Sequence, residues 1–206
     1  MKKAIVYINQ FFGQLGGEDT ADVAPEIREG QVGPAMEFDK ELEDCEVTHT
    51  IICGDNYIGS NTEEAVNQIL DMLKDLKFDL FIAGPAFQAG RYGVACGTIC
   101  KAVKDKFNVP VITSMNVENP GVEMFRKDMI IMEGGNIASK MRQDIKALVA
   151  VANKMLKGEQ VGPADEEGYF PTGHRHQVFL ESGETAADRF MKMLRARIHN
   201  EPYVSE

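Results

Sequence analysis

Polar and aromatic side chains gather in four loops, each of which follows a stretch that is expected to be a β-strand. These loops span residues 9–17, 53–57, 84–93 and 116–121. In a parallel α/β sheet, ligands bind beyond the carboxyl ends of the strands, so the four loops are expected to meet at one edge. A cleft of amides, one arginine and aromatic rings suits a small zwitterion or a modified side chain of a partner. The alternative is that the asparagines and glycines are ordinary turn residues. The predicted ligand-binding residues are Asn9, Gln10, Cys53, Asp55, Asn56, Phe87, Arg91, Tyr92, Glu118 and Asn119.

Arg91 is the one arginine in these loops, and it lies between the apolar run at residues 80–83 and a helical pattern that starts at about Tyr92. A strand, a glycine-rich turn and a helix N-terminus present unpaired N–H groups to an anion. The guanidinium group would add a bidentate donor for a carboxylate or a phosphate. The spacing matches neither G-x-G-x-x-G nor the Walker phosphate loop. The alternative is therefore an ordinary turn between a strand and a helix, with Arg91 in a surface salt bridge.

The cysteines and histidines predict no metal site and no catalytic residue. Cys96 and Cys100 share one helical face but lack further Cys or His ligands at zinc spacing, so they are expected to be small buried side chains. Cys53 ends a predicted strand and is the best candidate for a reactive thiol, although burial is the favoured interpretation. His174 and His176 would hold a metal only with ligands from elsewhere. There is also no Ser-His-Asp set and no paired-carboxylate signal.

Composition narrows the class of protein. The chain has 206 residues, of which 44% are hydrophobic and 26% charged, as in soluble globular proteins. The formal net charge of −10 argues against binding to nucleic acid or to an anionic membrane. No apolar run approaches the length of a membrane span, and no secretory signal precedes the first predicted strand. We therefore expect a cytoplasmic protein with reduced thiols.

Apolar runs alternate with helical patterns along the first three quarters of the chain. This alternation predicts an α/β fold of the Rossmann or flavodoxin type, with a doubly wound, mostly parallel, five-stranded sheet and helices on both faces. Residues 20–34 are expected to be irregular. The predicted strands span residues 3–8, 47–53, 80–84, 109–115 and 129–132. The predicted helices span residues 35–43, 63–76 with a cap from Asn61 and Thr62, about 92–107, 123–127, and 137–156 with an end at Gly158.

The composition changes after residue 157, where glycine, proline and acidic residues become frequent. We predict an α/β domain over residues 1–157 and a C-terminal arm and helix, a docking segment, over residues 158–206. Within the arm, residues 174–180 are expected to form a short extended piece. Residues 185–199 are expected to form a helix with its apolar side chains facing inward, namely Ala187, Phe190, Met191 and Leu194.

Several long segments resemble one known family. They are YINQFFGQLGGE, ADVAPEIREGQVGPA, TIICGDNY, IAGPAFQAGRYGVACGTICKAV, NVENPGVEMFRKD, EEGYFPTGHR and EPYVSE. These segments resemble the B component of the glycine, sarcosine and betaine reductases, and the resemblance covers nearly the whole chain. It implies a complex that cleaves a C–N bond reductively in anaerobic amino-acid fermenters. In that family, a selenocysteine on component B takes the carboxymethyl group, which passes to selenoprotein A and then to component C, which releases acetyl phosphate.

The chain departs from the family pattern in one respect, because it contains neither a selenocysteine nor a C-x-x-C motif. The family's large subunit continues past this point and carries its selenocysteine there. The resemblance therefore implies a lobe that contributes to the substrate cleft but is inactive alone, whether as a split subunit, a truncated one or a paralogue. The expected partners are the selenocysteine-bearing portion, a pyruvoyl-type subunit and selenoprotein A, with glycine, sarcosine or betaine as substrate, and the chain is expected to be part of an oligomer. The alternative is a non-catalytic module on the same fold that binds a small ligand or assists assembly.

Overall fold

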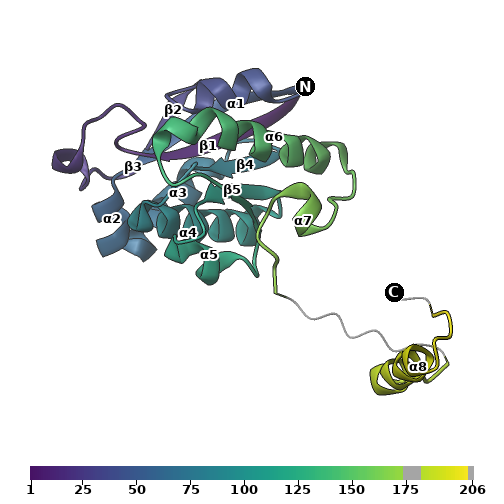
Figure 1. The fold of residues 1–206 in the computed structure, drawn as a ribbon. Helices are drawn as coiled ribbons and strands as arrows, with labels where there is room; N and C mark the ends of the chain where they lie inside the picture. The colour runs from purple at the N-terminus through teal and green to yellow at the C-terminus, as the bar shows by residue number, and fades with distance from the viewer. Residues whose placement is uncertain (174–181, 204–206) are drawn as a thin grey trace. The chain divides into compact units, whose positions relative to one another are not determined.

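A six-stranded sheet forms the centre of the larger part of the chain, as seen in a computed structural model that describes residues 1–173 and 182–203 (Figure 1). The strand order is β2-β3-β1-β4-β5-β6. Five strands run parallel, and β2 pairs antiparallel with β3 at one edge. The strands are β1 (Lys2–Asn9), β2 (Glu26–Glu29), β3 (Cys45–Cys53), β4 (Leu80–Ala83), β5 (Val111–Met115) and β6 (Ile130–Glu133).

Helices cover both faces of this sheet (Figure 1). Successive strand residues point to opposite faces, so Tyr7 and Phe81 belong to one buried core, and Val6 and Ile82 belong to the other. Burial on both faces explains why the parallel strands are continuous apolar runs. The first core is covered by α2 (Asp55–Ser60), α3 (Thr62–Leu73), α4 (Gly90–Phe107) and α5 (Pro120–Phe125), and the second by α1 (Ala35–Glu41) and α6 (Met141–Lys157).

The five predicted strands are present, but the predicted number of five is wrong because residues 26–29 add the edge strand β2. The predicted irregular stretch at residues 20–34 contains this strand. Its sequence, Glu-Ile-Arg-Glu, is mostly charged, and backbone pairing with β3 makes it a strand. The polar turn expected after β3 is also wrong, since α2 begins there at Asp55. Neither segment has the apolar periodicity from which a strand or helix is predicted.

The direction in which the chain crosses the sheet changes beside β1. From β1 the chain moves to β3 on one side, and it later returns to β4 on the other side of β1. Loops that leave the carboxyl ends of strands on either side of such a point diverge, and a crevice opens between them. Asn9, the last residue of β1, pairs with Cys53, the last residue of β3. The segments that follow these two strands therefore start side by side.

Two glycines on α4 allow α5 to pack directly against it. A Cβ atom at Gly93 would overlap the side chain of Asn119, and one at Gly97 would overlap the ring of Phe125. Asn119 precedes α5 and Phe125 is its last residue. Both ends of α5 are thus held against α4, and α4 is the helix that carries Arg91.

Residues after α6 return to the sheet. The helix ends at Gly158, as predicted, and a short helix, α7 (Ala164–Glu167), follows. The backbone N–H of Phe170 donates to the carbonyl oxygen of Ile131 at 2.9 Å, and the N–H of Glu133 donates to that of Gly168 at 2.9 Å. By its contacts the chain divides into two compact units, Met1–Gly173 and His174–Glu206. The predicted domain boundary after residue 157 stays a prediction.

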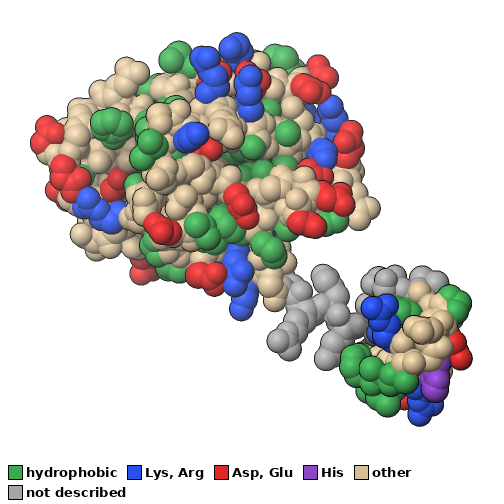
Figure 2. Space-filling view, in the orientation of Figure 1, with side chains coloured by type: hydrophobic (Ala, Val, Ile, Leu, Met, Phe, Trp, Pro, Cys, Tyr) green, Lys and Arg blue, Asp and Glu red, His purple; other side chains and the backbone are tan. Residues whose placement is uncertain are grey.

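The second unit contains α8 (Ala186–Ile198). Thr185 and Asp188 form a complete capping box at its start. Within its own unit α8 buries no residue, and Phe190 is 63% exposed, so the inward-facing apolar side chains stay a prediction. Figure 2 shows hydrophobic side chains gathered on this part of the chain. The predicted extended piece at residues 174–180, with His174 and His176, lies outside the described residues.

Candidate ligand-binding site

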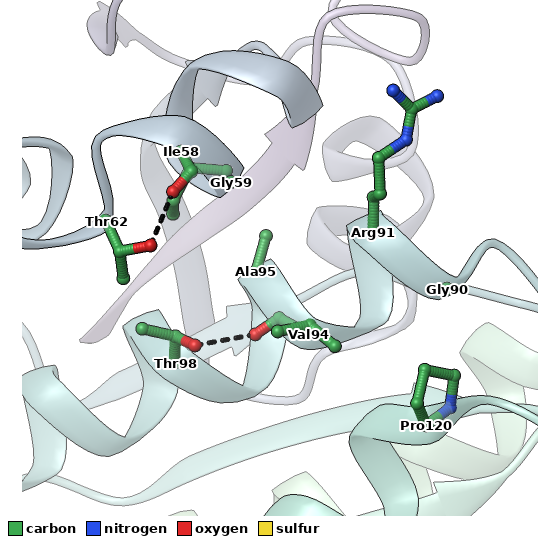
Figure 3. Close-up of a pocket in the computed structure, with 9 residues that line it drawn as sticks. All are labelled: Ile58, Gly59, Thr62, Gly90, Arg91, Val94, Ala95, Thr98 and Pro120. Carbon is green, nitrogen blue, oxygen red and sulfur yellow. Dashed lines mark hydrogen bonds between the residues drawn. The ribbon is translucent and has the colours of Figure 1, made fainter.

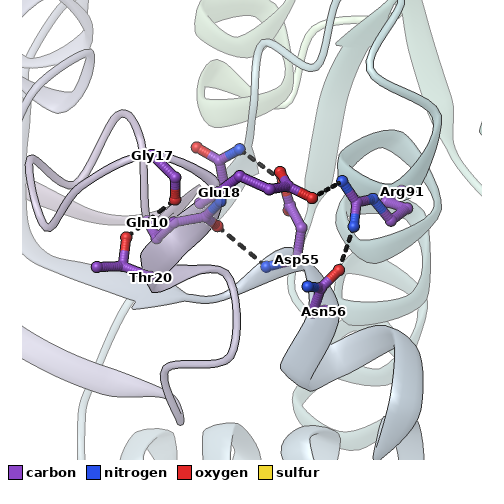
Figure 4. A network of polar contacts seen from close by, with 8 residues as sticks. Gln10, Gly17, Glu18, Thr20, Asp55, Asn56 and Arg91 are labelled. Carbon is purple, nitrogen blue, oxygen red and sulfur yellow. Dashed lines mark hydrogen bonds and ion pairs between the residues drawn. The ribbon is translucent and has the colours of Figure 1, made fainter.

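Three side chains from the ends of β1 and β3 form a buried polar network (Figure 4). The Nδ2 group of Asn9 donates to Oδ2 of Asp55 at 2.8 Å. The backbone N–H of Asp55 donates to Oε1 of Gln10 at 3.0 Å. The exposed fractions of Asn9, Gln10 and Asp55 are 6%, 3% and 8%. The pairing of Asn9 with Cys53 places these residues together, so this part of the site follows directly from the strand register.

Asp55 is incompletely satisfied. Its Oδ1 atom is enclosed and accepts no hydrogen bond from the residues that the structure describes. Burial raises the pKa of the Asp55 carboxyl group. The hydrogen bond from Asn9 and the charge of Arg91 oppose this rise in pKa, whereas the charge of Glu18 adds to it. A buried carboxyl group with a free oxygen is a strong acceptor without a donor.

Asp55 and the amides line a cleft of about 500 Å³ at the carboxyl edge of the sheet. Aromatic rings form its apolar wall. The ring of Phe12 lies 5.9 Å from that of Phe87 and 5.9 Å from that of Tyr92, measured between centroids. Tyr92 is fully buried, and its hydroxyl group has no hydrogen-bond partner within the described part of the chain. The cleft therefore combines aromatic faces with a carboxyl group and amides.

Arg91 lies at the rim of this cleft, where its side chain is exposed. One terminal nitrogen forms an ion pair with Oε1 of Glu18 at 2.5 Å, and the other donates to Oδ1 of Asn56 (Figure 4). Arg91 thereby connects α4 to the loop after β1 and to α2. This geometry agrees with the alternative expected from sequence, a surface salt bridge, and it still leaves the guanidinium group beside the cleft.

Asn119 has a different set of contacts from those of the cleft residues. Its Nδ2 group donates to the carbonyl oxygens of Phe87 at 3.0 Å and Ala89 at 3.1 Å, and its Oδ1 accepts from the N–H of Gly121 at 3.0 Å. These bonds cap α5 and hold the loop after β4. The exposed side chain of Glu118 accepts a hydrogen bond from Gln88. Both residues lie outside the lining of the cleft.

Cys53 is fully buried and also lies outside the cleft lining. Burial, together with the charge of Asp55, raises the pKa of its thiol to about 12. Burial likewise raises the pKa of Cys45 to about 11. All four cysteines are free and buried, including Cys96 and Cys100, as expected for that pair. A thiol with so high a pKa is almost entirely protonated at neutral pH and is a poor nucleophile.

The structure thus brings six of the ten predicted ligand-binding residues together at one cleft. They are Asn9, Gln10, Asp55, Phe87, Arg91 and Tyr92. Sequence reasoning missed Glu18 and the loop at Asn136, which also line the cleft. The loop at Asn136 follows β6, so the rule about carboxyl ends would have found it if applied to the fifth predicted strand. Glu18 has no such signal, because its partner Arg91 lies 73 residues away.

A second cavity lies beside the first (Figure 3). It has a volume of about 440 Å³ and is lined by residues of α2 and α4 and by the first residues of α3 and α5, with Arg91 shared between the two cavities. The hydroxyl groups of Thr62 and Thr98 donate to the carbonyl oxygens of Ile58 and Val94, each at 2.8 Å. The Thr98 bond lies within α4, and the Thr62 bond joins α3 to α2. Since both hydroxyl groups are engaged, this groove presents mainly apolar surface.

Within residues 1–173 and 182–203, no three His, Cys, Asp or Glu side chains are placed to hold a metal ion together. Across the same ranges, every helix is too short or too polar to cross a membrane.

A mostly parallel α/β sheet with a polar and aromatic cleft at its carboxyl edge defines a class of proteins that bind small ligands. Residues 1–206 match the model of the family described as glycine/sarcosine/betaine reductase selenoprotein B (GRDB), and the chain belongs to this family. The resemblance seen in the sequence is thereby confirmed.

Curated relatives of this chain are component B subunits of betaine, sarcosine and glycine reductase complexes. The chain is 61% identical over its full length to a betaine reductase complex component B subunit beta of Peptoclostridium acidaminophilum. It is 47% identical to the sarcosine reductase complex component B subunit beta of that organism, with 99% of the chain covered. It is 44% identical to a glycine reductase complex component B subunit gamma of Carboxydothermus hydrogenoformans, again over 99% of the chain. The chain spans 47% of the length of each of these relatives.

Proposed function

We propose that this chain is the lobe of a glycine-, sarcosine- or betaine-type reductase that forms part of the substrate cleft. The observation that carries the proposal is the family match over all 206 residues. The cleft supports it, because a site for a small zwitterion needs polar groups and apolar walls in one enclosed space. Betaine is the favoured substrate, since the relative at 61% identity is a subunit of a betaine reductase complex.

The role of the chain in this reaction is to bind and orient the substrate. Reductive cleavage of the C–N bond requires a nucleophile that attacks the substrate's methylene carbon. The cysteines are poorly suited to this task, because all four are buried and burial raises their pKa values. A selenocysteine on another segment or on a partner chain would supply the nucleophile. The proposed partners are that selenocysteine-bearing portion, a pyruvoyl-type subunit and selenoprotein A.

Co-expression tests this proposal. The chain is produced with and without a selenocysteine-bearing second half of a betaine reductase component B, together with the remaining components, inorganic phosphate and a dithiol reductant. We expect acetyl phosphate to form from betaine only when both halves are present, and we expect the two halves to copurify. The proposal is wrong if the second half alone supports full turnover, or if the two halves neither copurify nor restore activity.

A second candidate is a non-catalytic module that assists assembly of such a complex. The observation in its favour is the apolar groove between α2, α4 and α5 (Figure 3). The same co-expression experiment separates the two candidates. In the assembly role, the halves copurify, and no substitution in the lining of the cleft, whether of Gln10, Asp55 or Arg91, changes the KM for betaine.

A further inference from the structure

The floor of the cleft carries a negative group that the fold leaves partly unsatisfied. Asp55 is only 8% exposed, yet only one of its carboxyl oxygens accepts a side-chain hydrogen bond. Asp144 provides a comparison, because it is also buried and its pKa is also raised by burial. Both oxygens of Asp144, however, accept from the N–H of Gly135, at 3.1 and 2.9 Å. Asp144 therefore has a complete structural role, whereas Asp55 retains an unused oxygen at a cleft.

The charge of Asp55 is not needed for the bonds that it makes. An asparagine in its place would still accept the hydrogen bond from Asn9 through its amide oxygen, and its backbone N–H would still donate to Gln10. Burying an ionised carboxyl group costs more free energy than burying an amide. A positively charged ligand beside the carboxyl group would stabilise its charged form and so offset the cost of burying it.

The walls around Asp55 are suited to such a ligand. Phe12, Phe87 and Tyr92 line the same cleft, with Phe12 between the other two rings. Phe87 has a φ angle of +52°, which is uncommon for a residue with a side chain. Its carbonyl oxygen accepts from Asn119 and from the N–H of Asn116, which hold this conformation. Aromatic faces attract alkylated ammonium groups because the ring quadrupole presents negative charge to the cation.

We propose that Asp55, with the rings of Phe12, Phe87 and Tyr92, forms a subsite for a small organic ammonium group. The ligand's nitrogen charge faces the carboxyl group, and its methyl or methylene groups pack against the rings. The ligand enters past the rim, where the ion pair of Arg91 and Glu18 is exposed. The proposal rests on the proposed function only for the identity of the natural amine, and it concerns a feature of this chain's own residues.

Calorimetric titration of the full 206-residue chain tests the subsite with a matched pair of ligands. Betaine carries a trimethylammonium group, and 3,3-dimethylbutanoate has the same shape with a neutral carbon in place of the nitrogen. We expect betaine to bind about tenfold or more tightly than 3,3-dimethylbutanoate, because only betaine has a charge for the carboxyl group and the rings. Equal affinities, or no binding of betaine, would overturn the proposal.

Two variants locate the effect. Asp55→Asn keeps the hydrogen-bond acceptor for Asn9 and removes the charge, so it should weaken betaine binding about tenfold or more. Phe12→Leu keeps an apolar side chain and removes a ring, so it should weaken binding about three- to tenfold. Asp71→Asn is the matched control, because it makes the same change in net charge at an exposed position of α3 and should leave affinity unchanged. A thermal melt of each variant confirms folding.

The outcomes separate this inference from the proposed function. If betaine binds as expected but co-expression with the second half gives no turnover, the ammonium subsite stands and the reductase role fails. If turnover occurs but Asp55→Asn changes neither betaine affinity nor KM, the reductase role stands and the subsite is wrong.

Discussion

Helices α6 and α8 have similar amphipathic sequences and very different surroundings. Helix α6 buries one face against the sheet, with Leu148 at 0% exposure, whereas α8 buries no residue and its Leu194 is 39% exposed. The starts of the helices differ in the opposite sense. Helix α6 begins without a side-chain cap, and α8 begins with a complete capping box. Tertiary packing therefore holds α6, and local hydrogen bonds define α8. An amphipathic pattern predicts a helix but does not predict what the helix packs against.

The largest expected effect comes from the same substitution in the two helices. Leu148→Ala removes a fully buried side chain and should lower the free energy of unfolding by about 2–5 kcal/mol. Leu194→Ala, the matched control, should change it by less than about 0.5 kcal/mol. Urea denaturation followed by circular dichroism measures both. A loss of about 2 kcal/mol or more for Leu194→Ala would mean that α8 is packed in solution, and the contrast between the helices would be wrong.

The same contrast describes how much of the fold is predictable from sequence. Five strands were predictable because each is an apolar run whose side chains are buried on both faces of the sheet, namely β1, β3, β4, β5 and β6. Strand β2 was not, because its pairing with β3 involves residues about 23 positions away and its own side chains are mostly charged. Pairing between distant segments leaves no periodic signal in a short polar sequence.

The site shows the same division. Asn9, Gln10 and Asp55 lie at strand ends or directly after them, so the topology alone predicts that they meet. Asn119 follows a strand end as well, but its side chain caps α5 and supports the loop of Phe87. An asparagine has the same donors and acceptors in either role. Only the positions of its partners, which come from the loop before α4 and from α5, decide between a ligand contact and a helix cap.

A second pair of variants compares two helix caps. Asn119 caps α5 and also bonds the distant loop after β4, whereas Thr185 makes bonds only within the first turn of α8. Asn119→Ala removes three hydrogen bonds of a 2% exposed side chain and leaves buried backbone groups unpaired. We expect the free energy of unfolding to fall by about 2–4 kcal/mol. Thr185→Ala removes the cap of α8, and its cost of about 1 kcal/mol should appear only as faster amide hydrogen exchange within α8. If Asn119→Ala leaves the global stability unchanged, the loop after β4 does not depend on this side chain.

The smallest expected effect is a difference in pH dependence between Asp55 and Asp188. Burial raises the pKa of Asp55, whereas hydrogen bonds from the side chain and backbone of Thr185 lower that of Asp188. As pH rises from the ordinary value of 3.8 through the raised pKa, the unfolded chain releases the Asp55 proton before the folded chain does. The free energy of unfolding therefore falls over this window because the folded state must then hold a buried charge. The charges of Arg91 and Glu18 act on the same group in opposite directions.

Asp55→Asn removes this loss, so the stability of the variant relative to the parent should increase as pH rises from 3.8 through the raised pKa of Asp55 and then stay constant. Asp188 follows the opposite sign, since its lowered pKa adds stability above the ordinary value, and this is lost as pH falls through the folded pKa. Asp188→Asn should therefore leave global unfolding unchanged and speed hydrogen exchange in α8 more at neutral pH than at a pH below the lowered pKa of Asp188. Urea denaturation of parent and Asp55→Asn at a series of pH values measures the effect of Asp55. The contributions of the other carboxyl groups cancel in the difference between the two proteins. If Asp55→Asn instead becomes relatively less stable as pH rises, the carboxylate of Asp55 has a compensating partner within the chain. The floor of the cleft would then be a structural ion site, and the need for a cationic ligand would disappear.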